Sequence, residues 1–252
     1  MTLPTTMKAM VTMGHGDLDQ MVLHSDWPRP EPAADEVLIK VGACGLNNTD
    51  VNTRSGWYSK TVTDATTGGA FDHVGEDDPT WGGAPITFPL IQGADVCGEI
   101  VAVGKDVDPA CIGERVITDG WLRDAADLDD INKTGYFGSE RDGGFAEYTT
   151  TPARNALAIK SDLTDAELAT FSCSYSTAEG MLTRAQVGPN DTVLVPGSSG
   201  GVGGALVQLA KRRGARVIAM ASEAKHKDVT ALGPDKILSR APENLRAALG
   251  AE

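Results

Sequence analysis

The sequence lacks several features that would assign it to a specialised class of protein. No stretch approaches about 18 consecutive apolar residues, so we expect no membrane-spanning helix. Lys and Arg number 22 against 35 Asp and Glu, which gives a formal net charge of −13. Binding to nucleic acid or to an anionic membrane needs clustered basic residues, so this balance argues against both partners. The N-terminus has no basic region followed by an apolar run, as a signal peptide would, and we therefore expect a cytoplasmic protein.

Cysteine is also scarce. The four cysteines lie far apart, at Cys44, Cys97, Cys111 and Cys173. No two of them have the C-x-x-C spacing of a structural zinc ribbon, which argues against such a site. We therefore expect free, buried thiols.

The two halves of the 252-residue chain differ in their pattern. Up to about residue 158, short apolar runs such as 36–41 (EVLIKV) alternate with Gly, Pro and Asp, which is typical of a small β-barrel. Two polar stretches, 59–87 and 119–143, interrupt this pattern and are predicted to be long loops or lids. They carry four isolated aromatic residues, Trp81, Trp121, Tyr136 and Phe137. These side chains either cover a pocket or hold the loops in place, and we favour the second.

From about residue 160, predicted strands alternate with predicted helices. Thr164 and Glu167 have the spacing of a capping box, which predicts a helix start, and a second helix is expected from Thr177 to about Ala185. Strands are expected at 192–195, 216–220 and 235–238, with helices between them. This order predicts a parallel, doubly wound sheet. A complete dinucleotide-binding fold has about six strands, so a chain that stops at Glu252 after three is expected to be truncated at its C-terminus.

A glycine-rich turn, Pro196-Gly197-Ser198-Ser199-Gly200-Gly201-Val202-Gly203, directly follows the first of these strands and opens a helix. Glycine allows positive φ and close approach of the backbone to a pyrophosphate, and a helix N-terminus adds partial positive charge. Aligned with the pattern G-x-G-x-x-G, Ser198 takes the place of the first glycine, and Gly200 and Gly203 take the other two. We predict that a dinucleotide binds here, with Ser198, Ser199, Gly200, Gly201, Val202 and Gly203 as contacts. The alternative is a tight turn without a ligand.

The end of the second strand indicates which dinucleotide binds. An NAD site usually has Asp or Glu there to bind the ribose 2′-OH. Here Ala221 takes that position, and Ser222 and Lys225 follow, a hydroxyl donor and a cation that suit a 2′-phosphate. We therefore predict NADP(H), read by Ser222 and Lys225. The alternative is that Glu223 serves NAD.

Together these features resemble the medium-chain dehydrogenase/reductase superfamily over almost the whole chain. The opening strand and two recurrent barrel motifs of that superfamily look like residues 7–9 (MKA), 113–116 (GERV) and 143–148 (GGFAEY). The resemblance implies a GroES-like β-barrel catalytic domain over residues 1–158 and an incomplete Rossmann NADP-binding domain over 159–252. It also implies a small-molecule substrate and, for a full-length protein, a possible homodimer formed through the edge of the Rossmann sheet.

Two positions distinguish the zinc-dependent and zinc-free branches of this superfamily. Zinc members carry G-V-C-x-T-D and G-H-E, whose Cys and His bind the catalytic metal, whereas this chain has Asn47 and Ala94 at those places. Residues 47–58 (NNTDVNTRSGWY) instead resemble the N-P-x-D-x-x-x-R-x-G-x-Y stretch of quinone oxidoreductases, with Asn48 in place of Pro. The resemblance implies that NADPH transfers hydride to a quinone or an α,β-unsaturated carbonyl without a metal ion.

The same resemblance suggests residues for the active centre. Asn47 is predicted to contact the nicotinamide ribose or a substrate oxygen, and Tyr58 to bind the substrate oxygen or donate a proton. Both side chains have an alternative, purely structural role. Thr177 is predicted to contact the nicotinamide, and Asp50 and Arg54 are expected to pair and brace the site.

Two other functions stay open at this point. One is an alcohol dehydrogenase relative with a shifted metal site built from Cys44, Asp50, Asp95 and Cys97. The other is a noncatalytic nucleotide-binding fragment, which the early end of the predicted sheet suggests.

Overall fold

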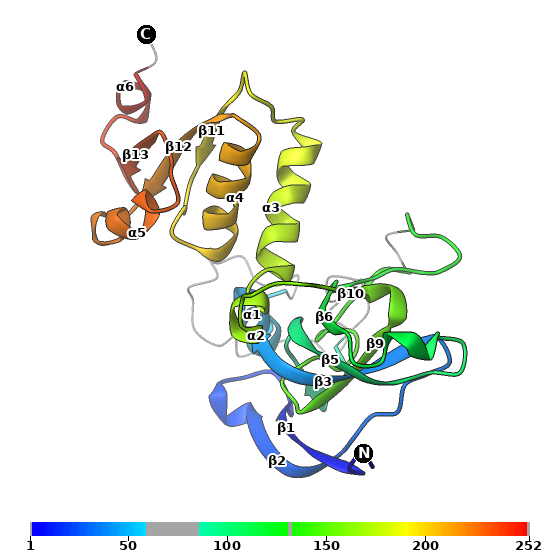
Figure 1. Cartoon of the computed structure of the whole chain (residues 1–252). Coiled ribbons are helices and arrows are strands. Elements are labelled where there is room, and N and C mark those ends of the chain that lie inside the picture. Colours follow the sequence, from blue (N-terminus) through cyan, green and yellow to red (C-terminus); the bar gives the residue numbers. More distant parts are fainter. Residues whose placement is uncertain (1, 59–85, 131–132, 251–252) are drawn as a thin grey trace. The chain divides into compact units, whose positions relative to one another are not determined.

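The computed structural model describes residues 2–58, 86–130 and 133–250 (Figure 1). The chain divides into two compact units, Met1–Ser172 and Cys173–Glu252. The predicted domain boundary after residue 158 lies earlier than this division and stays a prediction. Among the described residues, no helix combines the length and the apolar character that crossing a membrane requires.

The first unit is built from antiparallel strands. A five-stranded sheet has the order β10 (Ala156–Ala158), β6 (Arg115–Thr118), β5 (Asp95–Val103), β3 (Glu36–Gly45) and β9 (Tyr148–Pro152). A three-stranded sheet has the order β2 (Met21–Pro28), β1 (Thr6–Thr12) and β4 (Leu90–Ile91). The short apolar runs of the sequence therefore form the β-rich domain that they predict.

Alternating apolar side chains of these strands form the main core of the first unit. Val37 and Ile39 of β3 are fully buried and point to the same face, because successive strand residues point to opposite faces. They pack in one cluster with Ala94, Val96, Ile100, Val116 and Phe137. Burying an aliphatic side chain of this size contributes about 1.5–3 kcal/mol, so this cluster is a main source of stability for the barrel.

The polar stretch 119–143 is more ordered than the predicted loop. It contains a two-stranded antiparallel sheet of β7 (Trp121–Leu122) and β8 (Gly135–Tyr136). The rings of Trp121 and Tyr136 meet edge to face at 5.4 Å, and Phe137 is fully buried in the barrel core. The predicted long loop or lid therefore contains regular structure, and the burial of Phe137 agrees with the prediction that the aromatic residues hold the segment in place. Residues 59–85, with Trp81, lie outside the described residues.

Short helices complete the first unit: η1 (Leu18–Gln20), α1 (Asn48–Ser55), η2 (Pro109–Cys111), η4 (Ala153–Asn155) and α2 (Asp165–Leu168). The predicted capping box opens α2. The backbone N–H of Thr164 donates to Glu167 Oε2 at 2.8 Å, and the N–H of Glu167 donates to Thr164 Oγ1 at 3.3 Å. The helix then packs on β3 and β5, which is why this segment belongs to the first unit.

The second unit contains the predicted parallel sheet. Its strands have the order β11 (Thr192–Val195), β12 (Arg216–Ala221) and β13 (Lys236–Ser239). Its helices are α3 (Ser172–Arg184), α4 (Gly201–Arg212), η5 (Glu223–Lys225), α5 (His226–Thr230) and α6 (Leu245–Leu249). Helix α3 begins five residues before the predicted start at Thr177.

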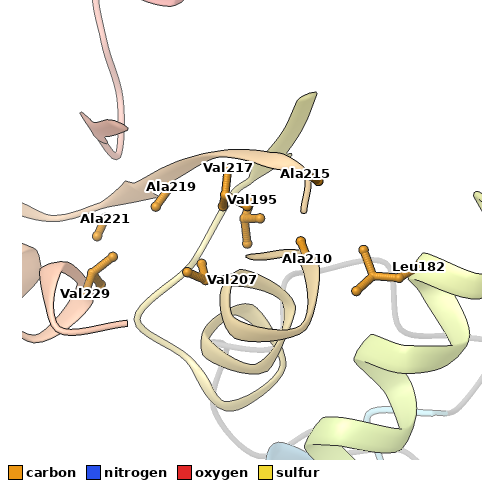
Figure 2. Packing of buried hydrophobic residues seen from close by; sticks show 9 residues of the cluster. All are labelled: Leu182, Val195, Val207, Ala210, Ala215, Val217, Ala219, Ala221 and Val229. Atoms are coloured by element: carbon orange, nitrogen blue, oxygen red, sulfur yellow. The ribbon is translucent and has the colours of Figure 1, made fainter. Parts of the chain in front are cut away.

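Helices pack on both faces of this sheet, as a doubly wound fold requires. One face carries a cluster that joins strand residues such as Val217 to Leu182 of α3, Val207 of α4 and Val229 of α5 (Figure 2). The opposite face carries Ile218, Met220 and Leu238, against which Ala248 and Leu249 of α6 pack. Residues 217–220 of β12 thus alternate between the two clusters and are buried on both faces.

Candidate functional site

The glycine-rich turn connects β11 to α4. The strand ends at Val195 and the helix begins at Gly201, with Gly200 as its N-cap. Gly197 has φ +65°, a left-handed conformation that favours glycine. The first helical hydrogen bond joins the N–H of Gly204 to the carbonyl of Gly200 at 2.8 Å. The N–H groups of residues 201–203 precede it and have no partner within the helix, so they form the positive end of α4.

Two glycines of the turn are required by the packing of the chain itself. A Cβ atom on Gly203 would lie 2.3 Å from the carbonyl oxygen of Gly197, and one on Gly201 would lie 2.6 Å from Oγ of Ser174 in α3. Gly200 differs, because its φ of −89° is ordinary and its Cβ would meet nothing closer than 3.5 Å. The fold leaves room beside Gly200, and a pyrophosphate lying close to the backbone would need that room.

Ser198 ties the turn to the next strand. Its side chain is fully buried, its hydroxyl donates to the carbonyl of Met220 at 2.9 Å, and its N–H donates to the same oxygen at 3.1 Å. Gly197, not Ser198, takes the left-handed conformation of the turn. The residue aligned with the first glycine of the pattern therefore anchors the turn, while Ser199 and Gly200 are exposed beside it.

The predicted readers of the 2′-phosphate follow β12 at its carboxyl end. The strand ends at Ala221, and Ser222 and Lys225 are both exposed. Lys225 Nζ lies 3.4 Å from Asp228 Oδ2, so the two charges form an exposed ion pair. Nε2 of His226 lies 3.2 Å from the carbonyl oxygen of Ala221, to which the ring must donate. Glu223 is exposed in the same short segment.

Helix α3 carries Thr177, which is half-buried. Its neighbour Ser176 is exposed and donates to the carbonyl of Cys173 at 3.3 Å. Ser174, one turn earlier, is buried and sets the close approach of α3 to Gly201. The nicotinamide contact assigned to Thr177 stays a prediction.

Asn47 is the N-cap of α1 in the first unit. Its backbone N–H donates to Asp50 Oδ2 at 2.8 Å, and its amide nitrogen donates to Asp95 Oδ2 at 3.1 Å. Asp95 lies at the start of β5 and is only 1% exposed. An amide nitrogen carries two hydrogens, so this bond orients the Asn47 side chain and leaves it one further donor.

Burial also acts on the ionisation of two neighbouring side chains, Asp50 and Cys44. Burial raises the pKa of Asp50 to about 6, although the N–H groups of Asn47, Gly93 and Asp50 itself act in the opposite direction. Burial also raises the pKa of the Cys44 thiol, and the charges of Asp50 and Asp95 raise it further. The thiol therefore stays protonated at neutral pH.

The described residues do not form the shifted metal site. In the pairing of β3 with β5, Cys44 lies opposite Val96 and Cys97 lies opposite Ala43. Cys97 packs with Leu168 on one side of the sheet, and its thiol donates to Asp165 at 3.5 Å, whereas Cys44 packs against the barrel core. In residues 2–58, 86–130 and 133–250, no three His, Cys, Asp or Glu side chains are arranged to hold a metal ion. All four cysteines are free thiols, as expected, but only Cys97 is buried, so the expectation of burial is wrong for the other three.

The remaining predicted residues of the first unit lie on α1 and just after it. The hydroxyl of Tyr58 accepts a hydrogen bond from Asn52 Nδ2 at 3.5 Å, and its ring lies 5.4 Å from that of Trp57. Arg54 donates to the carbonyl of Gly16, and the N–H of Gly16 donates back to the carbonyl of Arg54 at 2.9 Å. The expected pair of Arg54 with Asp50 is therefore wrong, because each of the two stabilises a different end of α1.

Sequence reasoning missed Gln92, which is 1% exposed and supports the start of α1. Its Nε2 donates to the carbonyl of Asp50 at 2.9 Å, and its Oε1 accepts from Thr12 at 2.8 Å. It also underrated Asp95, which entered only as a metal ligand. The sequence offered one signal for both residues, because Gln92 directly follows the apolar strand β4 and Asp95 begins the apolar strand β5. A polar side chain buried there without a partner is costly, so each position points to a hydrogen-bond partner.

The chain is similar to a known protein family and to solved structures. The sequence profile of the alcohol dehydrogenase GroES-like domain matches residues 33–161, which is 129 of 252 residues. A crystal structure of a protein from Sinorhizobium meliloti 1021, provisionally named an alcohol dehydrogenase, superposes with a TM-score of 0.84 and is 46% identical. That match covers 99% of this chain and 66% of the other. The expected fold, a GroES-like domain with a Rossmann-type parallel sheet, is confirmed.

Curated relatives include oxidoreductases that differ in name. An NADPH-dependent alkenal/one oxidoreductase of Arabidopsis thaliana is 30% identical over 247 residues, which cover 97% of this chain and 55% of the relative. A quinone oxidoreductase of Homo sapiens is 29% identical over 216 residues, which cover 85% of this chain and 53% of the relative. The chain thus spans about half the length of these two relatives.

Proposed function

The chain belongs to the medium-chain dehydrogenase/reductase superfamily, and from this premise we propose that it acts in an NADPH-dependent oxidoreductase that transfers hydride to a quinone or an α,β-unsaturated carbonyl without a catalytic metal. Residues 1–158 form the catalytic domain in this proposal, and residues 159–252 belong to the nucleotide-binding domain. The observation that carries it is the bond between Asn47 and Asp95, 3.1 Å long, at the place where zinc members have a cysteine ligand. Ala94, a methyl group only 3% exposed, occupies the place of the histidine ligand.

The chemistry of these side chains favours electron-poor acceptors. An amide and a methyl group do not replace a thiolate and an imidazole as zinc ligands. Without a Lewis acid, hydride transfer depends on positioning and on hydrogen bonds to developing charge. Quinones and enones suit such a site because the charge that forms on them is delocalised.

The turn between β11 and α4 has the properties that a dinucleotide pyrophosphate requires. Residues 201–203 offer N–H groups at the start of a 12-residue helix, and Gly200 leaves room for close approach. When bound, the nicotinamide supplies the hydride. In this proposal the glycine-rich turn binds the pyrophosphate. Ser222 and Lys225 bind the 2′-phosphate on the ribose, and Thr177 contacts the nicotinamide.

The first unit contributes the groups that meet the substrate. Asp95 holds one hydrogen of the Asn47 amide, and we assign the other to the nicotinamide ribose or to the substrate oxygen. We assign to Tyr58 a hydrogen bond to the substrate oxygen or the donation of a proton. Neither side chain carries a formal charge, so Asn47 acts by orientation and hydrogen bonding, and Tyr58 acts by hydrogen bonding or by giving up its phenolic proton.

A turnover assay tests the proposal. The purified chain is mixed with NADPH and either an enone or a benzoquinone, and loss of the reduced nicotinamide absorbance is followed with and without a chelator. We expect turnover that needs the acceptor and survives chelation. Asn47→Ala is expected to lower kcat/KM roughly 10- to 100-fold, whereas Asn48→Ala, on the exposed neighbour, serves as the matched control and changes it little.

Two results would contradict the proposal. If the chain oxidises an alcohol and a chelator abolishes this activity, the chain is a metal-dependent alcohol dehydrogenase instead. Saturable nucleotide binding without turnover of any acceptor would indicate a noncatalytic nucleotide-binding chain. Circular dichroism of Asn47→Ala distinguishes a lost catalytic group from a lost helix cap.

A further inference from the structure

Arg240 directly follows β13. It therefore lies at the carboxyl end of the parallel strands, where β12 ends at Ala221. Ala221 and Ser239 are register partners in the two parallel strands, and Ser222 and Arg240 are the next residues of each. Neighbouring strands lie about 4.8 Å apart, so Arg240 leaves the sheet beside Ser222. In open parallel sheets, ligands bind at the carboxyl ends of the strands.

The segment after β12 offers little net positive charge of its own. Residues 222–230 contain two lysines, Lys225 and Lys227, and two acids, Glu223 and Asp228, so their formal charges sum to zero. Lys225 already forms an ion pair with Asp228, its Nζ lying 3.4 Å from Oδ2. The ring of His226 donates to the carbonyl of Ala221, which directs that proton to the sheet.

Arg240 is different in its surroundings. Its side chain is exposed, and within the described residues it takes part in no hydrogen bond or ion pair. On a chain with a net charge of −13, an unpaired guanidinium beside Ser222 stands out. A guanidinium donates two parallel hydrogen bonds to a phosphate, which an ammonium group does not.

We infer that Arg240 binds the 2′-phosphate of NADP(H) together with Ser222 and so sets the preference for NADPH over NADH. The inference rests on the proposed function, because it concerns the same nucleotide. Ser222 supplies a hydroxyl donor, and Arg240 supplies the positive charge that the neutral segment 222–230 lacks. Lys225 then contributes less than Arg240 to binding of the 2′-phosphate, because Asp228 competes for its ammonium group.

Nucleotide binding by the purified 252-residue chain tests this inference. NADPH, NADH and adenosine 2′,5′-bisphosphate are titrated against the wild type, Arg240→Gln and Lys225→Gln. We expect Arg240→Gln to weaken NADPH and the bisphosphate roughly 10- to 100-fold and to leave NADH within about twofold. Lys225→Gln is expected to have a smaller effect on NADPH.

Arg216→Gln is the matched control. Arg216 is exposed at the other end of the six-residue strand β12, about 17 Å from Ala221 at 3.3 Å per residue. The Arg216→Gln substitution also removes one positive charge from the same sheet. A purely long-range electrostatic effect on nucleotide binding would therefore appear in both variants. We expect it to leave the ratio of NADPH to NADH affinity unchanged.

The possible failures point to different conclusions. If Arg240→Gln keeps the full preference for NADPH, or weakens NADH as much as NADPH, the inference is overturned and the proposed function stands. If the folded wild type prefers NADH, or binds neither nucleotide, the NADPH-dependent function itself is overturned, and the inference with it.

Discussion

Asp95 holds the side chain of Asn47, although 48 residues separate them in the sequence. The carboxylate accepts from the Asn47 amide nitrogen at 3.1 Å, and Asp95 itself is almost completely buried. The bond links the start of β5 to the N-cap of α1. It places a neutral, oriented donor where zinc-dependent members of the superfamily have a metal ligand.

Replacing Asp95 tests how much this bond contributes. Asp95→Ala leaves the half-buried amide of Asn47 without its acceptor, so we expect the free energy of unfolding to fall by about 1–3 kcal/mol. Asp95→Asn keeps an acceptor of the same shape and should lose less. Urea denaturation of both variants measures the difference. Equal losses would mean that the charge of Asp95, and not its hydrogen bond, matters.

Alanine substitutions of the glycines in and just after the turn are expected to have different effects on stability. Gly203→Ala places a Cβ 2.3 Å from a backbone oxygen, so we expect loss of about 3 kcal/mol or more of stability. In Gly204→Ala the new Cβ meets ordinary contacts at 3.5 Å or longer, and the higher helix propensity of alanine should stabilise α4 by up to about 1 kcal/mol.

Gly200→Ala is the informative third variant of this series. The chain has room for its Cβ, so we expect a normal melting temperature combined with weaker dinucleotide binding. Thermal denaturation and nucleotide titration of the three variants separate the two effects. Unchanged nucleotide affinity in folded Gly200→Ala would contradict the pyrophosphate position.

Asp50 should make stability depend on pH in the acid range. Its pKa is raised from 3.8 to about 6 in the folded chain, so between these values the folded state holds a proton that the unfolded state has released. The unfolded state is favoured as pH rises, and stability contributed by this group falls between pH 3.8 and about 6. The full effect is on the order of 1–3 kcal/mol.

A pair of proteins isolates this contribution from the other acids. Asp50→Asn is neutral at every pH and keeps an oxygen acceptor for the N–H of Asn47. Urea denaturation of wild type and variant at pH 4 and pH 7 should show the variant gaining on the wild type at the higher pH. An equal difference in stability at the two pH values would show that Asp50 titrates normally.

Local patterns were sufficient for much of the fold. The three parallel strands, the capping box of Thr164 and Glu167 and the glycine-rich turn were all predicted, because each depends on residues close together in the chain. The same patterns misjudged 119–143, where Gly and Asp obscured two very short strands. The position of Asn47 at the head of a helix was not visible from composition, since α1 is mostly polar.

The sequence by itself determined the family, the order of strands and helices and the residue types of the candidate site. Only the tertiary structure decided what these residues do: that Ser198 anchors the turn to Met220, that Asp95 orients Asn47, and that Cys44 and Cys97 lie on different sides of one sheet. The physical reason is separation along the chain. The partners lie 22 and 48 residues apart, and their contacts arise only when the pairing of strands and the burial of side chains bring distant segments together.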